Sequence, residues 1–174
     1  GHALMMFARG TPVIYYGDEQ GFSGDGGDQD AREDMFASQV ASYNDNRLVG
    51  SSATTARPSF RTDSALYGAI AAMTAIRASE PALRSGDMTV RASGDQPGLF
   101  AFSRRLPGGP ETLVVLNSST HVIKARLPVA YGADHWRSIH GDCAPRSTAP
   151  GSYAVEVKPL EYLICAATAA GGTH

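Results

Sequence analysis

Residues 10–19 combine a short apolar run with two carboxylates at its end. The β-branched and aromatic residues between the turn signals predict a buried strand over residues 13–16. Asp18 and Glu19 follow this strand, at the end where α/β barrels build their active sites. Neighbours on an extended segment point to opposite faces, so these two side chains cannot converge as a catalytic pair. We expect them to bind backbone groups or arginines at a barrel rim.

A second group of carboxylates lies on glycine turns, at Asp25, Asp28 and Asp30. Carboxylates gathered on glycine turns are one way to bind calcium. Their spacing is not that of an EF-hand loop, and the interpretation that we favour is a solvated turn. We therefore predict no metal ligand and no cofactor in this chain.

The predicted secondary structure changes near residue 86, from helices and a long loop to short strands. Good helix formers predict helices over residues 2–8 and 64–80, the second carrying an apolar stripe and ending at Pro81. Residues 17–62 show little periodicity and predict a long irregular connection, which is usually functional when ordered. Beyond residue 86 the pattern has a period of two, with turn signals between short runs. The predicted strands are 88–92, 99–105, 112–117, 121–127, 135–140, 153–157 and 162–166.

Length and composition limit the possible classes of protein. The chain has 174 residues, of which 43% are hydrophobic, so it can bury a core, but it is shorter than the roughly 200 residues of a complete (β/α)8 barrel. A formal net charge of -2 gives no basic footprint for nucleic acid. No apolar run approaches the length of about 18 residues that would span a membrane.

Cys143 and Cys165 are the two cysteines of the chain and fit no metal spacing. They could form a disulfide in an exported protein, or remain two reduced thiols in the core. The sequence does not choose between these states. Localisation is left open for the same reason, with secretion or the periplasm as the location that a disulfide would suit.

Three segments in this order resemble the C-terminal portion of the α-amylase family of glycoside hydrolases (family 13). Residues 10–19 are similar to the last barrel strand of that family. Residues 21–36 are similar to the loop that follows it, with Arg32 and Met35 in the matching spacing. Residues 76–86 are similar to the final barrel helix and its exit into a C-terminal sheet.

The resemblance implies an α+β chain. Residues 1–86 would be the C-terminal end of a (β/α)8 barrel, and residues 87–170 an antiparallel β-sandwich. It also implies retaining cleavage or transfer at α-glucosidic bonds, which needs two carboxyl groups about 5–5.5 Å apart. The family carries these groups on earlier strands, so no catalytic residue is predicted here and we expect the chain alone to be inactive. Calcium is expected, if at all, in a full-length parent.

Within this resemblance the predicted substrate-binding residues are Arg32, Tyr16 and Asp30. An arginine on this loop can pair with a carboxylate in bidentate fashion and close the end of a sugar pocket. The alternative for Arg32 is an ion pair that only holds the loop. Tyr15 or Tyr16 could pack on the C–H face of a sugar, and the alternative for either is core packing.

The expected partner is an α-glucan or oligosaccharide, bound through the parent enzyme, with no nucleic acid and no membrane. The rival hypothesis is a noncatalytic carbohydrate-binding or structural β-sandwich module. Such a module should expose a row of aromatic side chains on one sheet face. Trp136 and Tyr153 are the large aromatic residues best placed to do so.

Overall fold

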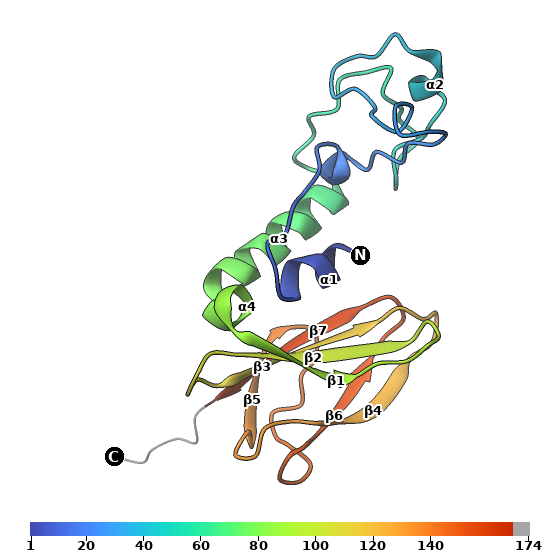
Figure 1. The fold of residues 1–174 in the computed structure, drawn as a ribbon. Coiled ribbons are helices and arrows are strands. Elements are labelled where there is room, and N and C mark those ends of the chain that lie inside the picture. Colours follow the sequence, from blue (N-terminus) through green and yellow to red (C-terminus); the bar gives the residue numbers. More distant parts are fainter. Residues whose placement is uncertain (169–174) are drawn as a thin grey trace. The chain divides into compact units, whose positions relative to one another are not determined.

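The computed structural model describes residues 1–168, which form two compact units (Figure 1). Residues Pro12–Thr74 form one, here called the loop unit. Residues 1–11 together with the chain from Ala75 onward form the other, here called the β unit. This division differs from the expected 1–86 and 87–170, which therefore stays a prediction, and residues 169 and 170 lie outside the described part. None of the described helices is long and apolar enough to cross a membrane.

The β unit is built from antiparallel strands in two sheets. The larger sheet has the order β1-β2-β3-β7-β5, and β4 pairs with β6 in a second sheet that forms the lower layer in Figure 1. Each strand predicted from the alternation is present, with its ends moved by at most two residues. The bounds are β1 Asp87–Ala92, β2 Leu99–Arg105, β3 Glu111–Asn117, β4 Ile123–Pro128, β5 His135–His140, β6 Ser152–Val157 and β7 Tyr162–Thr168.

The core of the β unit lies between these two sheets. Leu113 and Val115 on β3 are fully buried, and Tyr153 and Val157 on β6 are buried in the same cluster. Their spacing of two or four residues along each strand brings every second side chain to the inner face, as the period of two requires. In β6 the alternation leaves Glu156 exposed between two buried residues, whereas β3 and β7 are buried on both faces.

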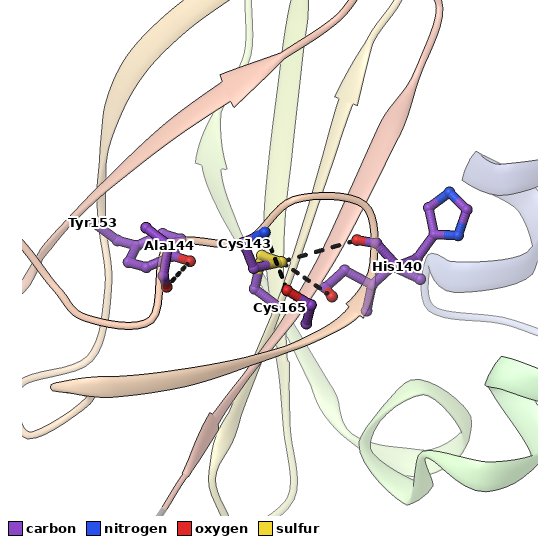
Figure 2. Close-up of a disulfide and its surroundings, with 7 residues drawn as sticks. His140, Cys143, Ala144, Tyr153 and Cys165 are labelled. Carbon is purple, nitrogen blue, oxygen red and sulfur yellow. Dashed lines mark hydrogen bonds between the residues drawn. A yellow bond between two sulfur atoms is a disulfide. The ribbon is translucent and has the colours of Figure 1, made fainter.

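A disulfide closes one side of this core. Cys143, in the loop after β5, is bonded to Cys165 on β7, with their Cα atoms 5.8 Å apart. Beside it, the Tyr153 hydroxyl donates a hydrogen bond of 2.6 Å to the carbonyl oxygen of Ala144 (Figure 2). The alternative of two reduced thiols is thus wrong.

The helices are α1 (His2–Phe7), α2 (Ala41–Asn44), α3 (Ala65–Ser79) and α4 (Pro81–Ser85), with a 3-10 turn η1 over Asp18–Gln20. The two predicted helices correspond to α1 and α3. Pro81 ends α3 as expected, but it also opens α4, which was not predicted. Proline suits the first turn of a helix because the missing N–H would have no partner there.

Two arginines of the β unit satisfy the carbonyl groups at the end of α1. Arg77 donates to the carbonyl oxygens of Met6 at 2.6 Å and Gly10 at 2.7 Å. Arg104 on β2 is 1% exposed and donates to the Phe7 carbonyl oxygen at 2.8 Å. The last carbonyls of a helix have no partner within it, so these guanidinium groups complete α1. Burial lowers the pKa of Arg104, and neighbouring arginines add to this effect.

The predicted strand over residues 13–16 is wrong for this structure. The segment is irregular, and Val13 and Tyr15 are 68% and 56% exposed. A strand exists only where a neighbour accepts and donates its backbone hydrogen bonds, and no described strand lies beside this segment. Residues 13–16 are apolar but form no strand, and the structure shows no recognisable fragment of a barrel.

Candidate functional site

Hydrogen bonds join the two ends of the long connection after residue 16. Gln20, at the end of η1, accepts from the Arg61 N–H and donates to the Arg61 carbonyl oxygen, both at 2.9 Å. Gly17 and Gly21, which flank η1, have φ values of 90° and 85° that favour glycine. The Ser64 hydroxyl also donates to the Glu19 carbonyl oxygen, at 3.2 Å, so local turns and these side-chain hydrogen bonds fix the two ends instead of a sheet.

Asp18 binds the backbone, as the sequence predicted. Its Oδ2 atom accepts a hydrogen bond of 3.2 Å from the Tyr15 N–H, three residues earlier. Glu19 is adjacent on the same 3-10 turn and accepts from the Gln20 side chain at 3.4 Å. This arrangement is typical of turn chemistry and does not make a convergent acid and base.

Tyr15 and Tyr16 form an exposed aromatic pair. Their ring centroids lie 4.7 Å apart, and the two side chains are 56% and 44% exposed. Phe22 packs edge-on against Tyr16 at 6.4 Å. Desolvation, with a smaller contribution from Tyr15, raises the pKa of Tyr16. Neither ring is packed in the core of the described chain, and contact with a sugar stays a prediction.

Arg32 pairs with Asp28, four residues earlier in an irregular turn. Both side chains are well exposed, at 56% and 81%. An exposed ion pair contributes about 0–1 kcal/mol, so it can open at little cost. The loop-holding alternative for Arg32 is thus present in the structure, while contact with a substrate stays a prediction.

Asp30 is exposed and lies close to Gly26, whose φ of 69° makes the turn. No described contact joins Asp30 or Arg32 to Tyr16, and their shared role in a site stays a prediction. Among residues 1–168, no group of three or more acidic, histidine or cysteine side chains could hold a metal ion.

Two features of the loop unit escaped the sequence analysis. Glu33 is 1% exposed, and neither of its carboxylate oxygens has a hydrogen-bond partner within the described chain. Phe36 and Phe60 form an edge-on pair at 5.1 Å although they are 73% and 53% exposed. No periodicity marks this polar segment, so nothing in the sequence distinguished its buried residues from its exposed ones.

The loop unit also contains a cavity of about 510 Å³. Its floor is mainly apolar and includes Leu48 and Leu66, while Gln20 and Arg57 are among its polar lining residues. An apolar hollow with a few polar groups is the usual form of a small-molecule site. None of the predicted residues Tyr16, Asp30 or Arg32 lines it.

Comparison with known proteins tests the resemblance to the α-amylase family. No family model matches the chain. An α-amylase from Streptomyces lividans is 40% identical to it over 156 residues, which is 88% of this chain. The resemblance to the α-amylase family is confirmed. The chain spans only 17% of the length of that relative, which is consistent with the C-terminal region of such an enzyme.

Two solved structures match the fold of this chain. An Anoxybacillus α-amylase matches 98% of this chain and 32% of its own, with a TM-score of 0.70 and 24% identity. A cyclomaltodextrinase matches 96% of this chain and 25% of its own, with a TM-score of 0.66 and 18% identity. At these identities the likeness establishes the fold, namely a mostly-β chain with few helices that matches the C-terminal β domain of α-amylases.

The β unit of this chain buries the two aromatic residues that the rival hypothesis needs to be exposed. Trp136 is 5% exposed and Tyr153 is fully buried, and their rings pack against each other at 4.5 Å. The Trp136 indole N–H donates to the Ser147 hydroxyl at 2.9 Å. Both residues therefore belong to the core, and the aromatic argument for a noncatalytic sugar-binding module is lost.

Proposed function

We propose that this chain is the C-terminal part of a retaining glycoside hydrolase of the α-amylase type that acts on α-glucans. The observation that carries the proposal is the 40% identity to an α-amylase over 88% of the chain. In this proposal residues 1–86 derive from the end of the catalytic barrel and supply part of the sugar pocket rim. The catalytic carboxylates come from outside this chain.

The exposure of Tyr15 and Tyr16 supports the role of a rim. Aromatic faces left in water are costly unless something covers them, and a sugar ring presents a C–H face that suits them. Arg32 supports it as well, because its pairing with Asp28 is exposed and can exchange for a ligand. Tyr16, Asp30 and Arg32 remain the proposed substrate-binding residues.

The absence of a catalytic pair can be tested directly with the chain of 174 residues. We expect no release of reducing sugar from soluble starch, because a retaining mechanism needs two carboxyl groups about 5–5.5 Å apart. A turnover above about 1 s⁻¹ from a contaminant-free preparation would contradict the proposal. The full-length parent, assayed in parallel, should release sugar, and an inactive parent would also count against the proposal.

The role of Arg32 is tested in the parent by Arg32→Lys. Lysine keeps the charge but loses the planar fork, so we expect kcat/KM on starch to fall by roughly tenfold or more. Arg47→Lys, an exposed arginine of the same unit that does not line the cavity, is the matched control and should change kcat/KM less than about twofold. If Arg32→Lys lowers Tm while kcat/KM per folded molecule stays unchanged, Arg32 only holds the loop.

A further inference from the structure

The strand edges of the β unit are not equally protected against pairing with a further strand. β1 and β5, at the edges of the larger sheet, each contain a register shift, and β5 also bonds to the segment at Pro145 and Arg146. β4 ends in Pro128 and carries Lys124 and Arg126. Bulges, prolines and basic residues are common means by which sheets prevent pairing at an edge. β6 has no register shift, no proline and no basic residue, so its edge is the most open.

The backbone groups of Ala154 and Glu156 point toward this open edge. The Val129 N–H donates to the Gly151 carbonyl oxygen, which makes these two residues a hydrogen-bonded pair at the end of the β4–β6 ladder. Hydrogen-bonded and non-hydrogen-bonded pairs alternate along an antiparallel ladder. The register therefore turns the N–H and C=O groups of Ala154 and Glu156 away from β4. No group within residues 1–168 forms a hydrogen bond with them.

A groove of about 530 Å³ reaches the same edge. Its lining residues are 124–126 of β4, Asp142 and Ala144 of the loop after β5, and 154–156 of β6. The Thr148 N–H of this loop donates to the Ser152 carbonyl oxygen, on the side of β6 that faces away from β4. The loop thus passes along the open edge. From the usual spacings of residues, strands and sheets, the groove has room for about three extended residues.

The loop that lines the groove is fixed in the unliganded chain. Cys143 is bonded to Cys165 on β7, and its N–H donates to the Ser138 hydroxyl at 3.2 Å. Next to it, the carbonyl oxygen of Ala144 accepts the hydrogen bond from Tyr153 (Figure 2). Because these bonds already hold the loop, little conformational freedom is lost there when a ligand binds.

The charges of the groove differ between its ends. Arg126, opposite Ala154 in the register, takes part in none of the ion pairs within residues 1–168. Asp142 also takes part in none, and it lines, with Glu156, both this groove and the adjoining hollow at the end of β6. Lys124 balances the charge of Glu156 at 3.0 Å. A ligand should therefore be acidic beside Ala154, where the side chain is small, and basic beside Glu156.

We propose that this groove binds an extended peptide of another protein, which joins β6 as an added antiparallel strand. The open edge offers two N–H donors and two carbonyl acceptors, and main-chain hydrogen bonds of this kind provide the affinity when a peptide adds to a sheet. Antiparallel pairing is the slightly more stable form. Side chains alternate between faces, so the residue opposite the buried Val155 should be apolar. The matching peptide has a basic, an apolar and an acidic residue, in that order.

The test is an NMR titration of the 174-residue chain with the peptide acetyl-Thr-Lys-Val-Glu-Thr-amide. We expect saturable shifts of the backbone amides of residues 142–144 and 154–156. Hydrogen exchange at Ala154 and Glu156 should slow by about fivefold or more at saturation, whereas the amides of Tyr153 and Val155, which face β4, should change little. The same peptide with N-methyl groups on its lysine and glutamate cannot donate to β6 and should not bind.

Arg126→Glu should weaken binding of the unmodified peptide about fivefold, because it places a carboxylate beside the peptide glutamate. Arg84→Glu, at an exposed arginine of α4 outside the groove, is the matched control and should leave binding unchanged. The comparison with the N-methylated peptide needs no variant and decides the matter if Arg126→Glu lowers Tm.

Four outcomes would overturn this proposal. They are an absence of saturable shifts up to about 10 mM peptide, equal binding of the N-methylated peptide, equal effects of Arg126→Glu and Arg84→Glu, and self-association of the chain that protects the same amides without peptide. The last outcome, seen by sedimentation, would assign the edge to a second copy of the chain. None of these measurements depends on starch, so the proposed function is tested separately.

Discussion

Glu33 in the loop unit and Glu111 in the β unit are both almost completely buried, but their carboxylates have different surroundings. Glu111 accepts from Arg91 at 2.6 Å, from the Ser103 hydroxyl, and from the Ala130 N–H at 2.7 Å. Glu33 is 1% exposed, and neither of its oxygens has a partner in the described residues. One buried charge is thus fully paired and the other is not.

The difference follows from how each unit is built. In the β unit, Arg91, Ser103 and Glu111 lie on the neighbouring strands β1, β2 and β3, whose register brings their side chains together. In the loop unit, the buried side chains of Gln20 and Thr55 have hydrogen-bond partners, but no paired strand places one beside Glu33. A buried polar group without a partner is uncommon in proteins and calls for an explanation. Strand register thus supplies the partners of Glu111, and no such register exists around Glu33.

The largest effect is expected from Glu111→Gln. The change leaves the guanidinium of Arg91 without its carboxylate, and breaking a buried pair in this way costs about 3 kcal/mol of unfolding free energy. Glu156→Gln, which removes an exposed partner of Lys124, is the control and should cost less than about 1 kcal/mol. Urea unfolding measures both. Equal losses for the two variants would show that the Glu111 network contributes no more than a surface pair.

Glu33→Gln should have the opposite sign and a smaller size. The amide keeps the shape of the side chain but removes a buried charge, so we expect the unfolding free energy to rise by about 1–2 kcal/mol. The same urea titration provides the measurement. A loss of more than about 1 kcal/mol would mean that the Glu33 carboxylate has a charged partner, and the contrast with Glu111 would then disappear.

The smallest effect at neutral pH is expected for Tyr153, whose hydroxyl also makes stability depend on alkaline pH. Burial raises the pKa of Tyr153 to about 12 in the folded chain, above the value of about 10 for an unfolded tyrosine. The unfolded state therefore loses this proton first, so stability is complete below pH 10 and falls as pH rises toward 12. Tyr153→Phe should weaken this pH dependence and lose about 1 kcal/mol at neutral pH with the hydrogen bond to Ala144. An unchanged slope between pH 10 and 12 in the variant would contradict this assignment.

The strands and the family resemblance could be predicted from the sequence because both depend on local patterns of residues. Alternation of period two predicted each strand of the β unit to within two residues at either end, and Pro81 predicted the end of α3. The ordered segments at residues 10–19, 21–36 and 76–86 pointed to the α-amylase family, which the 40% identity confirms. Each of these signals depends on neighbours a few residues apart in the chain.

Tertiary structure decided the features that depend on distant neighbours. The apolar run at residues 13–16 is not a strand, because a strand needs a second segment to pair with. The disulfide between Cys143 and Cys165 depends on β7 lying beside β5, and the burial of Trp136 and Tyr153 depends on two sheets that face each other. The unpaired burial of Glu33 lies in a segment without periodicity. In such a segment, the packing of the folded chain determines which side chains are buried, and no sequence pattern predicts it.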